Sequence, residues 1–377
     1  MEYKKVLLLQ VDSIMKYPPT ISLIHELDKL GKEVYVFTTQ VDEHLKNVLP
    51  KKTRLIKIGN DYKYSASRVH KVIELINIRK ECWRQIDRYY DTESILWIMS
   101  NITIKHLGDR LLKYNYNLHL FELVDSLYYF GKFRLAKINL KELCKRANKV
   151  IVCEYNRAHI TKTWFELENL PIIITNKAAP NKIEKKSSII HDKKGKEVLQ
   201  SINGKKIILY QGIVDKERPI EIIAEAIEQL SDEFVFLVMT GSCCDQLKRY
   251  KKTIVIPFVA PPYHLEITSH AYIGILIYTP VYGSFSSPLN AIYCAPNKLY
   301  EYSQFGLPMM GNDIPGLKYT IEYKKMGICV EKLEIEEIKK AIKVIEDSYG
   351  EYSKNAQRFY KQSSNEMAII EALTIKN

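Results

Sequence analysis

The sequence lacks the short motifs that most nucleotide-binding enzymes carry. No two of its 15 glycines are two residues apart, so the GxG core of the dinucleotide-binding fingerprint is absent, and no GxxxxGK[ST] loop occurs. No two aspartates are two residues apart either, so no DxD pair can hold a divalent ion against a diphosphate. These absences argue against a Rossmann dehydrogenase and a P-loop enzyme. They leave protein groups to neutralise any bound phosphate.

Cysteine clusters and long apolar runs are also missing. The seven cysteines are scattered, contain no CxxC and include one adjacent pair, Cys243 and Cys244, so neither a disulfide framework nor a zinc site is indicated. No window has the roughly 18 unbroken apolar residues of a membrane span, and the initial MEYKKVLLLQVDS lacks a signal peptide's apolar length and cleavage site. We therefore expect a cytoplasmic protein that holds no metal ion or other cofactor.

The chain has instead ample apolar material and an excess of positive charge. Its 377 residues, 46% of them hydrophobic, are enough for two domains with separate cores. The net charge of +12 indicates an anionic partner. Because no zinc-finger, basic-zipper or RNP-like pattern occurs, and lysine and arginine are spread along the chain, we expect no nucleic-acid partner.

An anionic membrane surface is another partner that fits the charge. Residues 126–137 interleave aromatic residues with three cations, and residues 68–90 form a long basic amphipathic pattern. Helices that face a core and carry solvated lysine and arginine would show the same features, so this alternative stays open. The expected apolar side of the second segment consists of Val69, Val72, Ile73, Ile76 and Trp83.

Short apolar runs alternate with amphipathic helical patterns along the whole chain. The runs are continuous, which indicates parallel strands buried on both faces. Alternating strands and helices predict two doubly wound, Rossmann-like α/β domains. The expected strands are 4–10, 33–39, 94–100, 117–123, 149–153 and 171–175 in the first half and 206–212, 234–241, 272–278, 307–311 and 327–330 in the second.

A lysine-rich segment separates the two sets of strands. Residues 181–206 contain eight lysines and little apolar pattern, although a short helix within them is compatible with the sequence. We therefore expect a first domain over 1–180, a linker over 181–205 and a second domain from residue 206.

The stretch APNKLYEYSQFGLPMMGNDIPG, at 295–316, predicts a short helix. Pro296 suits the first helical position and Gly306 the position after the last, so the helix has about ten residues. Lys298 adds a full charge to the positive end of the helix dipole, which makes the start of this helix a ready anion site. The first-turn amides expected to lack helical partners are those near Asn297, Lys298 and Leu299.

One residue on this helix indicates which anion would bind. Glu301 lies roughly 6 Å beyond the first turn, which is about the reach from a diphosphate to the hydroxyls of its ribose. One helix could therefore hold both parts of a nucleotide. A plain amphipathic helix on a sheet is the alternative, since it would also place Leu299, Tyr302 and Phe305 on one side.

A second anion site is expected after the strand KIILYQG. Gly212 ends this strand, and Arg218 stands beside Pro219 at the start of the next helix. An arginine there can fork two phosphate oxygens. An arginine that stabilises the turn is the alternative.

Taken in order, these segments resemble a known enzyme family. The match covers about 150 residues, and its PNKLYEY core is fairly specific. The first half resembles the family more weakly, through YPPTISLIHELDKLGKEVYVFTT and NLHLFELVD. The matching segments are YQGxxxxxRPIEIIAEAI, FLVMTGS, IVIPFVAPPYHL, AYIGILIY, N(x5)PNKLYEYSQFGLPMMGNDIPGL and GICVEKLEIEEIKKAI. Together they resemble the carboxyl-terminal half of glycosyltransferases with the GT-B fold, of the family 4 type that uses nucleotide sugars.

The resemblance implies a GT-B architecture with two domains facing a central cleft. Residues 206–350 would bind the nucleotide sugar, residues 1–180 the acceptor, and residues 351–377 would return to the first domain as a helical segment. Glu301 would accept hydrogen bonds from the ribose diol, and Arg218 would hold the diphosphate. The other donor-binding residues would be Gly212, Asn297, Lys298 and Leu299 at the phosphates, Phe258 and Val259 at the base, and Asn290 near the sugar.

The sequence departs from the family pattern at two positions. Many relatives carry a second glutamate eight residues before the ribose glutamate, where this chain has Tyr293. Many also carry an arginine directly after the glycine, where this chain has Ile213. The identity of the sugar is thereby left open.

Charge flow indicates the mechanism. As the anomeric bond to phosphate breaks, negative charge gathers on the nucleoside diphosphate, where Arg218, Lys298 and helix amides would stabilise it. We expect a retaining, metal-independent reaction, in which the leaving phosphate takes the proton of the acceptor hydroxyl. An inverting reaction would need a general base on the acceptor side, for which the candidates are Glu122, Asp125 and, behind them, His119.

The sequence thus predicts a glycosyltransferase that moves a sugar from a nucleotide-diphosphate sugar to a lipid-linked or saccharide acceptor. We expect a UDP-sugar donor, a role in surface polysaccharide (capsule) or glycoconjugate synthesis, and a peripheral location on the inner face of the plasma membrane. Two alternatives stay open. One is a nucleotide-sugar epimerase with the same fold, and the other is a non-catalytic sugar-nucleotide-binding partner of an assembly complex, which the departure at Tyr293 would favour.

Overall fold

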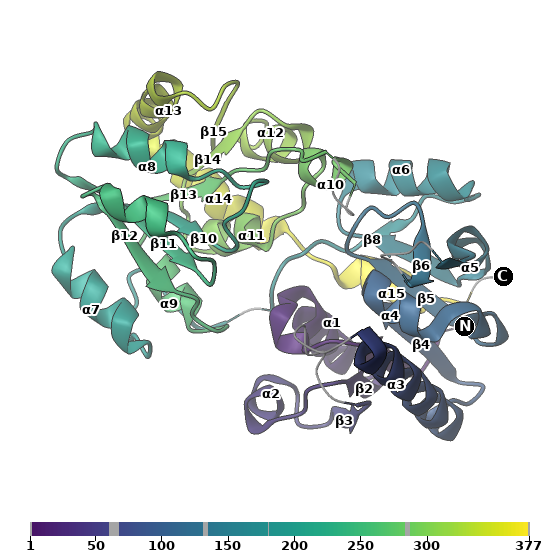
Figure 1. Cartoon of the computed structure of the whole chain (residues 1–377). Helices are drawn as coiled ribbons and strands as arrows, with labels where there is room; N and C mark the ends of the chain where they lie inside the picture. Colours follow the sequence, from purple (N-terminus) through teal and green to yellow (C-terminus); the bar gives the residue numbers. More distant parts are fainter. Residues whose placement is uncertain (1, 60–67, 131–134, 180, 283–286, 376–377) are drawn as a thin grey trace. The chain divides into compact units, whose positions relative to one another are not determined.

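The computed structural model describes residues 2–59, 68–130, 135–179, 181–282 and 287–375 (Figure 1). The chain divides into two compact units, which are Met1–Ala179 with Asn365–Asn377 (unit 1) and Pro180–Ser364 (unit 2). Each unit contains a parallel sheet with helices on both faces, as the alternating pattern predicts. Within the described ranges, no helix has both the length and the apolar character needed to cross a bilayer.

Unit 1 contains a seven-stranded parallel sheet in the order β3-β2-β1-β4-β5-β8-β9. One face is covered by α3, α4, α5 and α6, and the other by α1, α2 and α15 (Figure 1). The strands are β1 (Lys5–Gln10), β2 (Glu33–Thr38), β3 (Arg54–Lys57), β4 (Ser94–Met99), β5 (Tyr116–Leu120), β8 (Lys149–Val152) and β9 (Ile172–Ile173). The helices are α1 (Pro18–Lys29), α2 (Glu43–Val48), α3 (Arg68–Tyr89), α4 (Ser100–Leu107), α5 (Leu140–Arg146), α6 (Tyr155–Phe165) and α15 (Glu366–Leu373), with 3-10 turns η1 (Ile14–Lys16) and η2 (Gly108–Lys113).

Most of the aromatic and basic segment at 126–137 is a hairpin. Strands β6 (Leu127–Phe130) and β7 (Leu135–Ile138) pair antiparallel and form a separate two-stranded sheet. The alternative interpretation of this segment as a core-facing helix is therefore wrong. Two of the three cations on which its membrane interpretation depends, Lys132 and Arg134, lie outside the described residues.

Unit 2 contains a six-stranded parallel sheet in the order β12-β11-β10-β13-β14-β15. Helices α8 and α13 cover one face, and α7, α9, α11, α12 and α14 cover the other. The strands are β10 (Lys206–Gln211), β11 (Phe234–Thr240), β12 (Thr253–Pro257), β13 (Ile273–Leu276), β14 (Met309–Asn312) and β15 (Gly327–Val330). The helices are α7 (Lys193–Ser201), α8 (Glu221–Glu228), α9 (His264–Thr268), α10 (Leu289–Ile292), α11 (Asn297–Gln304), α12 (Pro315–Ile321), α13 (Ile335–Asp347) and α14 (Tyr349–Gln362), with the 3-10 turn η4 (Asp245–Arg249).

The segment expected to be a linker belongs to unit 2. It contains α7, and five of its apolar side chains pack in or against the unit 2 core: Ile183, Ile190, Val198, Leu199 and Ile202. The sequence does not predict this packing, because the apolar residues between the lysines are few and widely spaced.

The chain returns to unit 1 between Ser364 and Asn365, not near residue 351. Helix α14 stays in unit 2 because it packs on α11, where the rings of Tyr300 and Phe359 stack with centroids 5.5 Å apart. Only α15 of the expected return segment lies in unit 1, where Ile369, Ala372 and Leu373 join its core.

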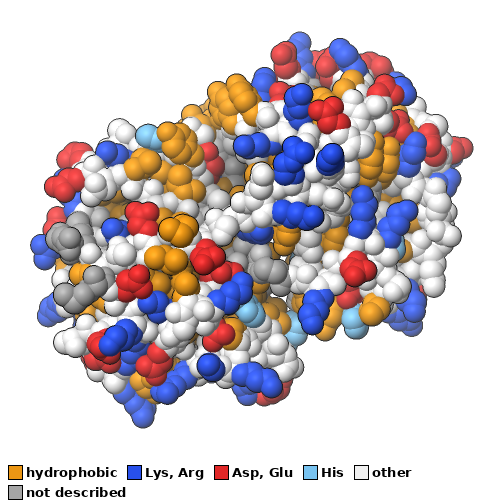
Figure 2. All heavy atoms as spheres, turned by 180° about the vertical axis from the view of Figure 1, so that it is seen from behind, with side chains coloured by type: hydrophobic (Ala, Val, Ile, Leu, Met, Phe, Trp, Pro, Cys, Tyr) orange, Lys and Arg blue, Asp and Glu red, His pale blue; other side chains and the backbone are white. Residues whose placement is uncertain are grey.

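Charged side chains of both signs cover the surface. Figure 2 shows lysine and arginine spread over the drawn face with aspartate and glutamate among them. Lys206, for example, lies 2.8 Å from Glu233 and 2.6 Å from Glu346. On this face the positive charge therefore does not form the single stripe typical of nucleic-acid binding.

Candidate functional site

Helix α11 has well-defined ends. Pro296 is the N-cap, with φ −73° and ψ 137°, and is not the first helical residue that the sequence predicts. At the other end Gly306 adopts φ +63°, and the amide of Leu307 donates to the carbonyl of Tyr302 at 3.0 Å. This is the Schellman arrangement, in which a left-handed residue after the helix lets the chain turn sharply.

Tyr302 seats α11 closely on the sheet. Its ring occupies the space beside Gly274 of β13, where an added Cβ would come within 2.3 Å of the ring. Its hydroxyl lies 3.4 Å from the carbonyl of Leu209 in β10 and 3.5 Å from that of Ile275 in β13. The close approach places the preceding residue, Glu301, at the carboxyl end of β10, where parallel sheets bind their ligands.

Glu301 is a buried carboxylate with a partner at each oxygen. Its side chain is 7% exposed, Gln211 Nε2 donates to Oε2, and His264 Nε2 lies 3.4 Å from Oε1. Thr268 Oγ1 in turn donates to Gln211 Oε1 at 2.6 Å and so fixes the amide orientation. Burial alone would raise the pKa of Glu301, but the hydrogen bond from His264 and the charges of His264 and Lys298 lower it overall. The carboxylate is therefore ionised at neutral pH.

Lys298 precedes Glu301 by three residues and lies on the same side of α11. Its Nζ is 5.3 Å from the ring centroid of Tyr210 and 5.4 Å from that of Tyr278. Burial, and then the charge of Arg218, lower the pKa of Lys298 to about 8, against the opposing charge of Glu301. The ammonium is thus a charge held in a low-dielectric environment.

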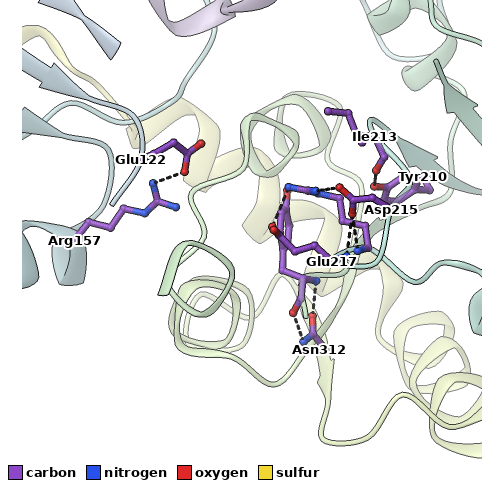
Figure 3. A network of polar contacts seen from close by, with 9 residues as sticks. Glu122, Arg157, Tyr210, Ile213, Asp215, Glu217 and Asn312 are labelled. Carbon is purple, nitrogen blue, oxygen red and sulfur yellow. Dashed lines mark hydrogen bonds and ion pairs between the residues drawn. The ribbon is translucent and has the colours of Figure 1, made fainter. Parts of the chain in front are cut away.

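Arg218 lies against the same tyrosine ring. Its Cζ is 5.1 Å from the centroid of Tyr278, so both cations contact this ring. Its Nη1 donates to Asp215 at 2.9 Å and its Nη2 to Glu217 at 3.0 Å, and Figure 3 shows both carboxylates turned toward the guanidinium. Arg218 therefore stabilises the turn, which is the alternative role that the sequence leaves open. At 21% exposure its side chain is still accessible to an anion.

Gly212 provides the space that Lys298 occupies. It adopts φ +129°, and an added Cβ would lie 3.1 Å from Lys298 Nζ. Its amide donates to the carbonyl of Met239 at 2.9 Å. The following residue, Ile213, is 64% exposed, and its carbonyl accepts from the hydroxyl of Tyr210 (Figure 3). Any other residue at 212 would be strained and would crowd the ammonium.

The remaining expected donor residues differ in accessibility. Phe258 follows β12 and is 62% exposed, whereas Val259 is buried. Asn290 is buried within α10. Asn297, the first residue of α11, is half-buried. Leu299 is buried, and its amide donates to the carbonyl of Pro296 at 3.1 Å, so the expectation that this amide lacks a partner is wrong.

Comparisons with known proteins relate the fold, but not the sequence, to other chains. No family model and no curated protein matches this sequence. The solved structure of the Anabaena protein HepE in complex with UDP-glucose superimposes with a TM-score of 0.67 over 98% of each chain, at 13% identity. WaaG, a glycosyltransferase involved in lipopolysaccharide biosynthesis, matches with a TM-score of 0.57 over 98% of each chain, at 11% identity. A Listeria monocytogenes protein assigned as a UDP-N-acetylglucosamine 2-epimerase matches with a TM-score of 0.62 over 97% of this chain and 94% of that one, at 11% identity.

The chain has the GT-B fold. The two Rossmann-like domains predicted from the sequence are thereby confirmed, with a seven-stranded and a six-stranded parallel sheet. Sequence identities this low establish only a shared fold. The function of the site must therefore be inferred from this chain's own residues.

His119, one of the acceptor-side candidates, lies on β5 of unit 1 and is 1% exposed. Its Nδ1 accepts a hydrogen bond from Trp97 Nε1 at 3.4 Å, and burial lowers the pKa of His119 to about 3. The imidazole is therefore neutral and enclosed. Its burial was not visible in the sequence, because it depends on contacts with Trp97 and Phe121 that only the tertiary fold brings together.

Glu122 and Asp125 follow β5 and are exposed. Arg157 Nη1 lies 3.7 Å from Glu122 Oε2 (Figure 3), and the Glu122 side chain is 59% exposed. Asp125 accepts a hydrogen bond from Ser126 Oγ at 3.1 Å. Both carboxylates are accessible to a ligand of unit 1.

The sequence did not identify three of the residues that surround Glu301. Gln211 could have been found, because it is a polar residue at the carboxyl end of an otherwise apolar strand. His264 and Thr268 carried no signal, since they lie on a single-turn helix whose contact with α11 depends on the tertiary fold. In the part of the chain that the structure describes, no three His, Cys, Asp or Glu side chains are grouped as metal ligands would be.

Proposed function

We propose that this protein is a glycosyltransferase whose donor is a nucleotide-diphosphate sugar, with UDP-sugars favoured. One observation carries the proposal: α11 presents a buried, ionised carboxylate, Glu301, one turn from the half-buried ammonium of Lys298, and Arg218 contacts the same tyrosine ring as that ammonium. A diphosphate is stabilised by fixed cations, and a ribose diol by a fixed acceptor. The complexes of HepE with UDP and with UDP-glucose support a uridine donor.

Each donor residue then has a defined role. Arg218 and Lys298 bind the diphosphate, and Glu301 accepts hydrogen bonds from the ribose hydroxyls. Gly212 lets the ligand approach the strand end closely. The remaining assignments are Asn297 and Leu299 beside the phosphates, Phe258 and Val259 at the base, and Asn290 near the transferred sugar.

The chemistry follows from charge. When the anomeric C–O bond breaks, the electron pair stays on the diphosphate, and Arg218 and Lys298 stabilise that charge more than they stabilise the intact donor. The acceptor hydroxyl attacks the same face, and its proton passes to the leaving phosphate oxygen. The configuration is retained in this proposal, and neither a protein nucleophile nor a metal ion takes part.

The acceptor is assigned to unit 1. Glu122 and Asp125 are exposed carboxylates after β5 and suit the hydroxyls of a saccharide, whereas His119 is enclosed and neutral. In the retaining reaction Glu122 would bind the acceptor, and it would be the catalytic base only in an inverting one. The proposed acceptor is a lipid-linked or free saccharide of a surface polysaccharide or glycoconjugate.

Exposed isoleucines on α3 and α4 support a location at an anionic membrane. Ile73 and Ile76 are 49% and 43% exposed, and Ile102 is 44% exposed. Helix α3 leads into β4 and α4 follows it, so both run opposite to the strand and parallel to each other. Arg110, in the turn after α4, lies 2.7 Å from Asp87 of α3 and so links that turn to α3.

Helices α3 and α4 pack against each other on one face of the sheet and carry these isoleucines together with cations. Lys80 follows Ile76 by four residues and Lys105 follows Ile102 by three, so each isoleucine has a cation one turn behind it. Apolar groups with cations behind them suit a bilayer surface of anionic lipids.

Replacing Ile76 and Ile102 together with glutamate should weaken binding to anionic vesicles about ten-fold, because two partly exposed apolar side chains no longer enter the interface. Co-sedimentation with vesicles of phosphatidylglycerol and phosphatidylcholine measures the effect. Leu170→Glu is the matched control in the same unit, since Leu170 is 39% exposed. Equal binding by the double variant and the control would rule out this surface.

Lys298 should make nucleotide binding depend on pH. The ammonium with a pKa of about 8 loses its charge above pH 8, whereas a bound diphosphate should restore a value near 10.5. Binding then takes up a proton, so affinity for UDP is expected to be nearly constant below pH 7 and to fall about ten-fold between pH 7 and 9. Isothermal calorimetry measures this, and Lys298→Gln should remove the slope. A slope that persists in Lys298→Gln contradicts the assignment.

The test of the proposed function is a donor panel. Thermal shift with UDP, GDP and dTDP identifies the base, and their sugars identify the donor. Transfer is then assayed with saccharide acceptors, and NMR of the product reports the anomeric configuration. A protein that none of these diphosphates stabilises is not a nucleotide-sugar enzyme of this kind.

A nucleotide-sugar epimerase is the second candidate, because the Listeria monocytogenes protein assigned to that activity shares the fold over nearly the whole of both chains. An epimerase changes the donor sugar without an acceptor. Incubating the protein with UDP-N-acetylglucosamine alone therefore separates the two functions: an altered sugar supports the epimerase, and an unchanged one supports the transferase.

A further inference from the structure

We infer that residues 181–191 form part of the donor site, in which they position Glu301 through the two helices that surround it. The inference rests on the proposed role of Glu301 at the ribose. The sequence assigns this segment to a linker, yet its contacts are with α9 and α11.

The first contact joins the segment to α11. Asn181 Nδ2 donates to Gln304 Oε1 at 3.0 Å, and Gln304 Nε2 donates back to Asn181 Oδ1 at 2.7 Å. Gln304 follows Glu301 by three residues, so the reciprocal amide pair holds α11 one turn beyond the carboxylate.

The second set of contacts joins the segment to the end of α9. The amide of Lys186 donates to the carbonyl of Ser269 at 3.0 Å, and the amide of Ser187 donates to Ser269 Oγ at 3.1 Å. His270 Nε2 lies 2.8 Å from the carbonyl of Ser187. Lys186 adopts φ +56°, a left-handed conformation that a lysine keeps only where its surroundings fix it.

The third contact is a two-point clamp on α9. Both oxygens of the buried Glu266 face His191: the backbone amide donates to Oε2 at 2.7 Å, and Nδ1 lies 2.6 Å from Oε1. The ring of Tyr263 lies against the imidazole, with centroids 4.9 Å apart. Residues two apart on a helix point to opposite sides, so Glu266 faces the segment while His264 faces Glu301.

The contacts close a ring. From Glu301 the path runs along α11 to Gln304, across to Asn181, along the segment to His191, and through Glu266 and α9 to His264, which returns to Glu301. The ring has two joints between the segment and the helices, which are the Asn181–Gln304 pair and the His191–Glu266 pair. Opening either joint leaves the carboxylate of Glu301 in place but less well oriented. Ribose hydroxyls require an acceptor held within about 0.5 Å, so the loss should fall on hydroxyl recognition and not on the base or the phosphates.

The experiment compares the affinities of UDP and 2′-deoxy-UDP. The intact protein should bind UDP about ten-fold more tightly, because the extra hydroxyl donates to a carboxylate. Asn181→Ala and His191→Ala should each reduce this preference to about three-fold. The exchange Asn181→Gln with Gln304→Asn rebuilds the amide pair and should restore the preference. Glu266→Gln tests the other joint independently.

Asn355→Ala is the matched control in unit 2. Its Nδ2 donates to the carbonyl of Lys325 at 3.0 Å, away from both joints. If Asn181→Ala and His191→Ala weaken UDP and 2′-deoxy-UDP equally, the segment is only structural and the inference is overturned. If the unaltered protein binds neither nucleotide, the proposed donor site itself is refuted.

Discussion

Arg218→Ala should lower kcat about 100-fold with the matching donor sugar, because a fixed cation at the leaving diphosphate is lost. The loss should exceed any change in KM, since the negative charge grows as the anomeric bond breaks. Arg218→Lys should recover part of the rate, because it returns the charge without the planar fork. Steady-state kinetics with a radiolabelled donor measures all three proteins.

Two checks keep this result interpretable. Arg249→Ala removes another arginine of unit 2, which pairs with Glu221 at 2.6 Å and is mostly exposed, and it should leave kcat unchanged. Circular dichroism should show that the turn held by Asp215 and Glu217 tolerates the substitution. Parental kcat/KM in a folded Arg218→Ala would mean that the diphosphate binds elsewhere.

Glu301→Ala should lower kcat/KM at least ten-fold, which corresponds to about 1.4 kcal/mol of lost transition-state binding. The carboxylate is ionised and oriented by Gln211 and His264, so hydrogen bonds from ribose hydroxyls to it would be of the strong, charge-assisted type. The loss of kcat/KM should be much smaller with a 2′,3′-dideoxy donor, because that donor lacks the ribose diol that Glu301 would bind.

Glu322→Gln is the matched control for this change. Glu322 is a half-buried carboxylate of unit 2 that accepts from the amide of Cys329 at 2.9 Å, outside the proposed site. An equal loss for the natural and the dideoxy donor with Glu301→Ala would show that the carboxylate supports the fold and does not bind the ribose.

The sequence predicts the central strands and the edge strands β9 and β15, but it misses the edge strands β3 and β12. Strands β4 and β11 are buried at every position, and such continuous apolar runs are readable without a structure. Strand β3 (RLIK) is exposed at both ends, and β12 is only partly buried, because each lies at the edge of its sheet. Their short, mixed sequences resemble turns.

The charged residues of the proposed donor site could be singled out because they lie close together in sequence or beside a turn signal. Lys298 and Glu301 are on one short helix, and Arg218 lies six residues after Gly212 and directly precedes Pro219. Of the partners of Glu301, Gln211 could have been found as a polar residue at the end of an apolar strand, whereas His264 and Thr268 could not. Residues 211, 264 and 301 meet only because β10 lies beside β13 and α9 packs on α11, which is a property of the whole domain.

The contact between Tyr302 and Gly274 limits how relatives of this chain can diverge. A side chain at position 274 would occupy the space of the ring, so the two positions can change only as a pair. A lineage that acquired alanine at 274 would have to shrink residue 302 or lift its helix from the strands, and Lys298 and Glu301 would move with it. Selection on the proposed activity would therefore act on two residues that are not assigned any contact with substrate.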